Sequence, residues 1–121
     1  MARAVPIFRI FDYQKVVEFY VGWLGFKLDW EDKPANAPVY LQVSLNGITI
    51  HLSEHYGDCS AGARIHIEDF AGLKEYHAEL INKNYKFMRP GLGTAGYDKS
   101  TLCMEVVDPF GNRITFTEKT K

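Results

Sequence analysis

The sequence has few of the features that mark secreted, membrane or nucleic-acid-binding proteins. It contains only two cysteines in 121 residues, Cys59 and Cys103, and these are expected to be free thiols in a reducing cytosol. No apolar run approaches the roughly 20 residues that a membrane helix needs, and the N-terminus lacks a hydrophobic signal segment. The formal net charge of −1 gives no electrostatic basis for binding nucleic acid. We therefore expect a cytoplasmic protein with neither a membrane nor a nucleic-acid partner.

Aromatic residues, by contrast, are abundant, at 14% of the chain. Most of them are expected in the core, although an excess of aromatics also suits a protein that stacks on flat ligands. The apolar content of 46% and the charged content of 24% are ordinary for a globular protein. A chain of this length favours a single domain.

The first half of the chain predicts a β-α-β-β-β order. Asp12 is the expected N-cap of a helix, because apolar residues follow it at helical spacing, at positions 13, 16, 17, 20 and 24. Gly25 is expected to end that helix. Asn46-Gly47 between two alternating segments is the strongest short hairpin signal. The predicted elements are strands at 5–11, 27–31, 39–45 and 48–53 and a helix at 13–24.

The same pattern then starts again after a linker at 54–61. Asp69 is predicted to cap a second helix, and the spacing of Asp69-Phe70 to Tyr76-His77 is identical to that of Asp12-Tyr13 to Phe19-Tyr20. Asp108–Asn112 is predicted to be a tight turn between two alternating strands. The predicted elements are strands at 63–67, 86–88, 102–107 and 113–117, a helix at 69–84 and a long loop at 89–99.

These two halves predict a duplicated unit of the α+β class. Two tandem βαβββ modules, at about 4–54 and 62–118, make up one domain covering residues 1–121. Neither module could bury its own sheet alone, so the modules are expected to pack on each other or on a second chain.

At this point the sequence resembles the vicinal-oxygen-chelate superfamily, which includes glyoxalase I, ring-cleaving dioxygenases and the bleomycin-resistance proteins. The resemblance covers nearly the whole chain. It rests on Val16–Phe26 (VVEFYVGWLGF), on Ile67–Phe70 and on the terminal DPFGNRITF. It implies the glyoxalase/bleomycin-resistance fold, with curved mixed sheets, helices outside and a concave pocket inside.

The resemblance also implies where enzymes of the superfamily would hold a divalent metal. Its four ligand positions fall at Val5, Thr49, Gly62 and Thr115. Valine and glycine side chains cannot ligate, and two threonine hydroxyls are poor ligands for Zn²⁺ or Fe²⁺. We therefore expect no metal, no cofactor and no catalytic residue.

Within the superfamily, the sequence is most similar to the bleomycin-resistance proteins, which are dimers that hold a flat, cationic glycopeptide antibiotic. The resemblance implies a homodimer and puts an aromatic that stacks on the drug at Trp30. A second stacking aromatic of that group falls at about Ser100, and Tyr97 on the same predicted loop is the nearest substitute. The expected function is to sequester bleomycin-family antibiotics without chemistry, which gives antibiotic resistance.

Strand alternation adds further residues on the presumed concave face. His51 and His66 are each either a structural histidine, a hydrogen-bonding group for a ligand, or part of a relocated metal site with Glu54 or Glu105. The predicted ligand-binding residues are Trp30, Tyr40, His51, His66, Tyr97 and Ser100.

Arg64 and Arg113 are also predicted on the concave side. Two buried cations are costly without partners, so they either pair with Glu105 or another acid, or face solvent or an anionic ligand. Two alternative functions stay open. One is a metal-dependent glyoxalase- or dioxygenase-like enzyme of the same fold, and the other is a metal-free binding domain for another small molecule.

Overall fold

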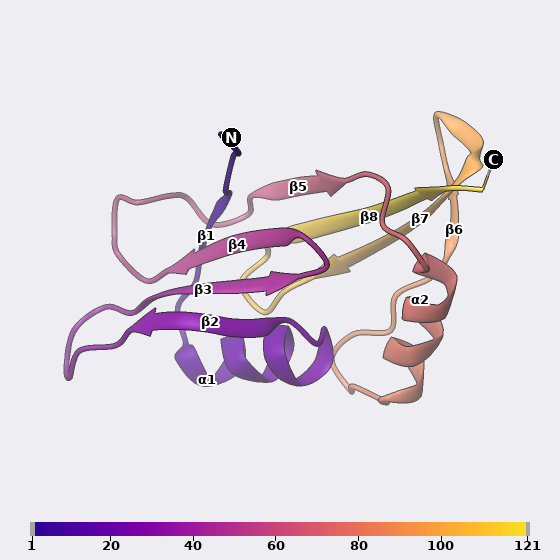
Figure 1. Ribbon diagram of the computed structural model, residues 1–121. Helices are drawn as coiled ribbons and strands as arrows, with labels where there is room; N and C mark the ends of the chain where they lie inside the picture. Colours follow the sequence, from indigo (N-terminus) through magenta and orange to yellow (C-terminus); the bar gives the residue numbers. More distant parts are fainter. Residues whose placement is uncertain (1, 121) are drawn as a thin grey trace. The chain divides into compact units, whose positions relative to one another are not determined.

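The computed structural model describes residues 2–120, which form two compact units (Figure 1). The first unit runs to Ala63 and includes Asp108–Asn112, and the second consists of Arg64–Val107 and the chain from Arg113 onward. The order β-α-β-β-β occurs twice, which confirms the predicted tandem of βαβββ modules and the α+β class. Within the described residues, no helix is long and apolar enough to span a membrane.

The first unit contains a four-stranded mixed sheet in the order β1-β4-β3-β2. Strand β1 (Ile7–Arg9) is parallel to β4 (Ile48–Ser53), and β3 (Tyr40–Leu45) is antiparallel to both β4 and β2 (Lys27–Asp32). The predicted hairpin turn between β3 and β4 is confirmed. Its two central residues, Asn46-Gly47, both have positive φ, at 49° and 85°, as the favoured two-residue hairpin turn requires.

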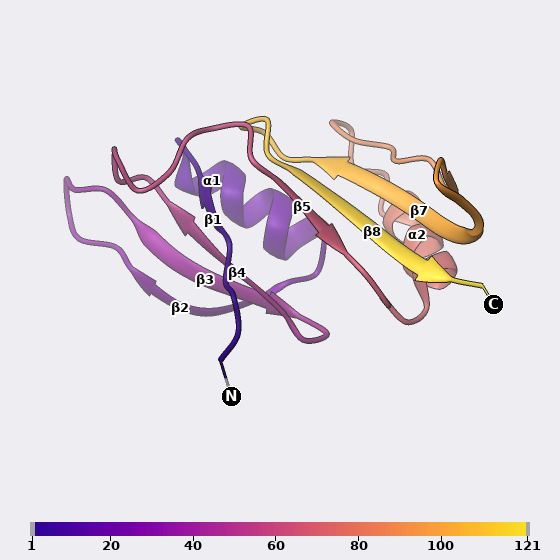
Figure 2. The same cartoon turned by 90° about the horizontal axis from the view of Figure 1, so that it is seen from above.

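A helical segment lies along one face of this sheet (Figure 2). Helix α1 (Tyr13–Val16) continues directly into a π-helix, η1 (Val17–Trp23). The predicted cap is confirmed, because the Asp12 carboxylate accepts a hydrogen bond from the backbone N–H of Lys15 at 3.2 Å. The predicted end is confirmed as well, since Gly25 has a φ of 84°.

The π-helix makes the buried face of this segment wider than the predicted stripe. The backbone N–H of Leu24 donates to the carbonyl of Phe19, five residues earlier, at 2.9 Å. Phe19 and Trp23, which the predicted stripe omitted, are buried beside Tyr20 and Leu24. The wider π-helical turn places additional aromatic rings in the core. A search for apolar residues at the 3.6-residue period of an α-helix cannot predict such a turn.

The Asp108–Asn112 turn is built into the first unit by buried hydrogen bonds. The Asp108 carboxylate accepts from the Tyr20 hydroxyl at 2.8 Å, from Nδ2 of Asn112 at 2.9 Å, and from the backbone N–H groups of Phe110 and Asn112 at 2.9 Å each. The Asn112 amide also donates to the backbone oxygen of Arg9 at 2.8 Å. Burial raises the pKa of Asp108, while the donors around it act in the opposite direction.

The second unit repeats the topology in the order β5-β8-β7-β6. Strand β5 (Arg64–Ile67) is parallel to β8 (Arg113–Lys119), which is antiparallel to β7 (Asp98–Val107). Strand β6 (Gly93–Ala95) pairs with the outer edge of β7, and helix α2 (Leu73–Asn82) packs against β7 and β8.

The predicted strand at 86–88 is wrong, and the predicted loop at 89–99 is wrong at 93–95 and 98–99, which lie in strands. Residues 86–88 lie in a turn, and the pairing strand is β6, inside the segment predicted as a loop. Ala95 pairs with Asp98, so Gly96 and Tyr97 form a tight connection into β7. A hairpin closed over two residues costs less loop entropy than pairing from position 86 would, which favours the observed register.

The predicted cap of the second helix is also wrong. Asp69 has a left-handed φ of 59°, and α2 begins only at Leu73. The helix N-terminus is capped from another strand, because the Glu118 carboxylate accepts from the backbone N–H groups of Gly72 at 3.1 Å and Leu73 at 2.9 Å. A carboxylate at this position satisfies free N–H groups and complements the helix dipole. The helix ends at Asn82, two residues before the predicted end.

The buried Tyr20 hydroxyl should contribute strongly to stability because it donates to a buried carboxylate. We expect Tyr20→Phe to lower the free energy of unfolding by about 1.5–3 kcal/mol in urea titrations. Tyr13→Phe is the matched control, because its hydroxyl donates to the exposed Glu31 at 2.6 Å, and it should cost roughly 0.5 kcal/mol or less. Equal losses for the two variants would contradict this interpretation.

The cap on α2 gives a second stability prediction. Glu118→Ala removes both acceptors of the helix N-terminus and should cost about 1 kcal/mol of unfolding free energy, whereas Glu118→Gln keeps one acceptor and should cost less. Glu79→Ala, an exposed position within α2, is the control and should change stability little. If Glu118→Ala is as stable as the control, Glu118 does not act as the cap.

Candidate functional site

Polar and aromatic side chains occupy the face of the first sheet that the helix does not cover. Along β3, Leu41 and Val43 are fully buried, whereas Tyr40, Gln42 and Ser44 are partly exposed. This alternation confirms the predicted two-sided pattern of the strand.

A β-bulge in β2 turns two neighbouring residues toward this open face. Leu28 pairs with Val43 and Trp30 pairs with Gln42, so β2 holds one extra residue, Asp29, between these pairs. The Asp29 carboxylate accepts from Nε2 of Gln42 at 2.9 Å and from the Ser44 hydroxyl at 3.0 Å. Asp29 was not among the predicted ligand-binding residues, because simple alternation puts it on the opposite face from Trp30.

Three of the predicted ligand-binding residues form an aromatic cluster on this face. The Trp30 and Tyr40 rings are nearly parallel, 9° apart, with centroids at 6.0 Å. The His51 ring meets each of them edge-on, at 5.4 Å from Trp30 and 5.2 Å from Tyr40. Trp30 remains 45% exposed, so the neighbouring rings hold a surface that solvent or a ligand can reach.

A directed chain of hydrogen bonds fixes the protonation of His51. The Gln42 amide nitrogen donates to Asp29, so its oxygen accepts the N–H of His51 Nε2 at 2.9 Å. His51 Nδ1 is then the acceptor for the Tyr40 hydroxyl at 2.7 Å. Burial, followed by the nearby Arg3 cation, lowers the pKa of His51, which favours this neutral form.

The same hydrogen bonds hold Asp29 as an anion. The donors from Gln42 and Ser44 lower the pKa of Asp29 below its ordinary value, and the charges of Lys27 and Arg3 act in the same direction. The open face therefore carries a fixed negative charge one residue from the exposed Trp30. Such a pair of groups attracts cations to an aromatic surface.

The remaining predicted ligand-binding residues lie in the second unit. The Tyr97 hydroxyl lies 3.4 Å from Nε2 of His66, and Tyr97 is 70% exposed. Ser100 lies on β7, where its backbone N–H and hydroxyl both donate to Asp98, at 3.0 and 2.7 Å. The structure thus brings His66 and Tyr97 together, whereas Ser100 is engaged with a different residue.

The two arginines of the second unit share one carboxylate. Arg64 and Arg113 form ion pairs with Glu105 at 2.7 and 2.8 Å, which confirms the pairing alternative for these residues. The pKa of Glu105 is lowered by hydrogen bonds from Arg113 and Thr115 and by the charge of Arg64, against the effect of burial. Two cations on one anion leave a net positive charge on this part of the second unit.

The four metal positions implied by the resemblance do not fit a metal centre. Val5 and Gly62 offer no donor atom, and the Thr115 hydroxyl donates to Glu105 at 3.2 Å. Among residues 2–120, no three His, Cys, Asp or Glu side chains gather closely enough to hold a metal ion. His51 and His66 each contact a tyrosine hydroxyl in their own unit, Tyr40 and Tyr97 respectively.

Comparison with known proteins identifies the family. The sequence model of a family described as "Glyoxalase superfamily protein" matches residues 1–121. The chain belongs to the glyoxalase superfamily. The resemblance noted in the sequence is thereby confirmed at superfamily level. A search of curated proteins finds no significant match.

Solved structures of the superfamily share the fold over nearly their whole length. A bleomycin-binding protein complexed with bleomycin is 14% identical, with 98% of this chain and 99% of that chain covered and a TM-score of 0.69. The antibiotic-binding protein TnmS3 from Streptomyces sp. CB03234 is 19% identical, with coverages of 98% and 97% and a TM-score of 0.66. A glyoxalase family protein from Bacillus anthracis is 18% identical, with the same coverages and a TM-score of 0.68. Membership therefore does not by itself separate binding from catalysis.

The lowered pKa of His51 predicts a loss of stability in acid. The unfolded chain binds the His51 proton more readily than the folded protein, so the stabilising contribution is present above about pH 6.5 and is lost as pH falls through the folded pKa. We expect thermal melting between pH 8 and pH 5 to show a smaller acid-induced decrease for His51→Gln than for the wild type. His55→Gln serves as the control and should behave like the wild type. Parallel curves for all three proteins would contradict the prediction.

Proposed function

We propose that this protein binds and sequesters flat, cationic antibiotics of the bleomycin family, without breaking or forming a bond in them. The proposal rests mainly on one observation, the Trp30–Tyr40–His51 aromatic cluster beside the ionised Asp29. Two solved structures with the same fold carry names that describe antibiotic binding, and they support the proposal at the level of the fold.

Stacking on Trp30 supplies the first part of the binding energy. Tyr40 lies parallel to the indole and His51 meets it edge-on, so the exposed indole is held in one orientation before the ligand arrives. A preorganised aromatic surface lowers the entropy cost of binding. Each aromatic pair contributes about 0.5–1.5 kcal/mol beyond the area that it buries.

Charge supplies the second part. Asp29 stays ionised because Gln42 and Ser44 donate to it, and a ligand cation near Trp30 gains both this ion pair and a cation–π interaction. The arginine pair on Glu105 disfavours a cationic group in that part of the second unit. We therefore assign the cationic, flat portion of the ligand to the open face of β2 and β3. The proposal further includes a cytoplasmic homodimer, as the resemblance implies.

A calorimetric titration of the purified protein with bleomycin tests the proposal. We expect saturation near one drug per chain with a dissociation constant between nanomolar and micromolar, or roughly −12 to −8 kcal/mol. Trp30→Ala should weaken binding about 10- to 100-fold, and Asp29→Asn, which removes the charge but little volume, should weaken it about tenfold. Phe87→Ala removes an exposed aromatic of the second unit and should bind like the wild type.

Two outcomes would contradict the proposal. The first is the absence of heat at high micromolar drug, and the second is equal binding by the wild type and Trp30→Ala. Metal analysis of the same preparation separates the alternatives. A stoichiometric metal whose removal abolishes turnover of a glyoxalase or dioxygenase substrate would favour the enzyme. Binding of many aromatic compounds with none preferred would favour a binding domain for another ligand.

A further inference from the structure

Arg9 carries a positive charge that no described acidic residue neutralises. It follows Phe8 and precedes Ile10, both fully buried, so alternation along the chain turns the Arg9 side chain away from the core. None of the ion pairs within residues 2–120 includes Arg9. Its Nη1 atom is buried and has no hydrogen-bond partner in the described part of the chain. A buried donor without an acceptor lowers the stability of the fold by about 1–3 kcal/mol. A role in binding would explain why an arginine occupies this position.

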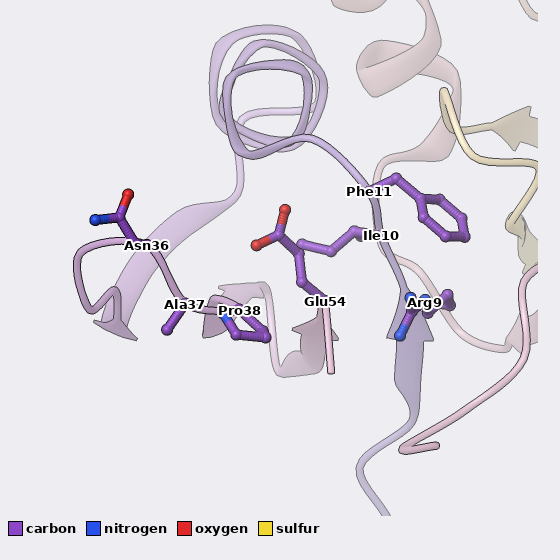
Figure 3. A pocket seen from close by; sticks show the side chains of 7 residues that line it. All are labelled: Arg9, Ile10, Phe11, Asn36, Ala37, Pro38 and Glu54. Carbon is purple, nitrogen blue, oxygen red and sulfur yellow. The ribbon is translucent and has the colours of Figure 1, made fainter. Parts of the chain in front are cut away.

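The nearby carboxylates are engaged with other donors. Glu54 accepts from the backbone N–H of Val39 at 2.9 Å, and Figure 3 shows its carboxylate turned away from the Arg9 guanidinium. Asp58 accepts from the Ser53 hydroxyl at 2.6 Å. Within the described residues, neither carboxylate forms an ion pair with Arg9.

Two cavities of the first unit are lined by Arg9 and by Phe11. One, of about 360 Å³, is also lined by Glu54 and Pro38 (Figure 3). The other, of about 480 Å³, is lined by residues of the loop that contains Tyr56; no carboxylate is among its lining residues, although Asp58 lies in that loop. An anion would be repelled by Glu54 in the first cavity, whereas the residues that line the second cavity include no carboxylate.

The second cavity also has aromatic walls. The Arg9 guanidinium carbon lies 4.8 Å from the centre of the Phe11 ring, within the range of a cation–π interaction. Phe11 is 58% exposed and Tyr56 is 97% exposed, so both rings can contact a ligand. A volume of about 480 Å³ is in the range of small-molecule sites.

We propose that Arg9 is the anion-binding group of a second site in the first unit, which takes a small aryl carboxylate or aryl phosphate. The anion pairs with the planar guanidinium, and the aryl ring lies against Phe11 and Tyr56. A partly desolvated cation without a counter-ion attracts an anion more strongly than a solvated one does. The site shares no residue with the Trp30 cluster, so it can be tested independently of the proposed antibiotic binding.

Titration with phenyl phosphate, followed by amide chemical shifts and by the melting temperature, tests this site. We expect phenyl phosphate to bind the wild type and Arg9→Gln to weaken this binding at least tenfold. Arg9→Lys should weaken it less, because lysine keeps the charge but loses the paired N–H donors of the planar guanidinium. Arg89→Gln removes an exposed cation of the second unit and should bind like the wild type. Equal binding by the wild type and Arg9→Gln, or no binding to either, would overturn the proposal.

Two further measurements remain informative if Arg9→Gln folds poorly. Tyr56→Ala changes a fully accessible side chain, and it should weaken phenyl phosphate several-fold while leaving the weaker binding of inorganic phosphate unchanged. Equal affinities of the wild type for the two phosphates would overturn the aryl part of the proposal. Arg9→Met removes the buried N–H without an acceptor and should raise the melting temperature of the ligand-free protein by roughly 3 °C. A lower melting temperature would overturn the proposal, because it would mean that Arg9 stabilises the ligand-free protein.

Discussion

The buried carboxylate of Asp108 is the interaction on which the first unit depends most. An ionised carboxylate in an apolar core is costly unless every oxygen is hydrogen-bonded, and here four donors reach it. They come from Tyr20 in the helical segment and from the turn itself, and Asn112 extends the network to the backbone of β1. A turn more than 80 residues from the helix is thereby made part of the same unit. Strand β1 in turn pairs with β4, which carries His51.

A second constraint acts on the open face of the same sheet. The bulge in β2 lets two consecutive residues face one way, and the hydrogen bonds of Asp29, Gln42, His51 and Tyr40 then run in a single direction toward the carboxylate. Chains of this kind strengthen each member, so the cluster is rigid as well as charged. Rigidity and charge together are what a protein that captures a flat cation needs from its sheet. Arg9 differs in that its Nη1 atom has no hydrogen-bond acceptor within residues 2–120.

The sequence indicated the parts of the fold that local chemistry decides. Asn46-Gly47 specifies its own turn, Asp12 caps the helix that follows it, and the polar and apolar residues of β3 alternate as the pleat requires. Trp30, Tyr40 and His51 were predicted as binding residues separately, and the structure brings them into contact. The assignment of these residues to a ligand is still a prediction.

The failed predictions each involve a partner distant in sequence or an irregular backbone. Asp69 has the sequence signature of a cap, but Glu118 takes that role from a strand 45 residues away. Asp29 was not among the predicted ligand-binding residues, because a bulge changes which face of the sheet a residue occupies and no single residue type indicates a bulge. The buried face of the first helical segment is wider than predicted because π-helical hydrogen bonding changes the number of residues per turn.

The central claim is that the open face of the first sheet receives the ligand. The most direct measurement follows the backbone amide chemical shifts of the protein as bleomycin is added. We expect the largest changes at Asp29, Trp30, Tyr40 and His51, on strands β2, β3 and β4. Changes confined to other elements, with these four amides unmoved at saturating drug, would contradict it.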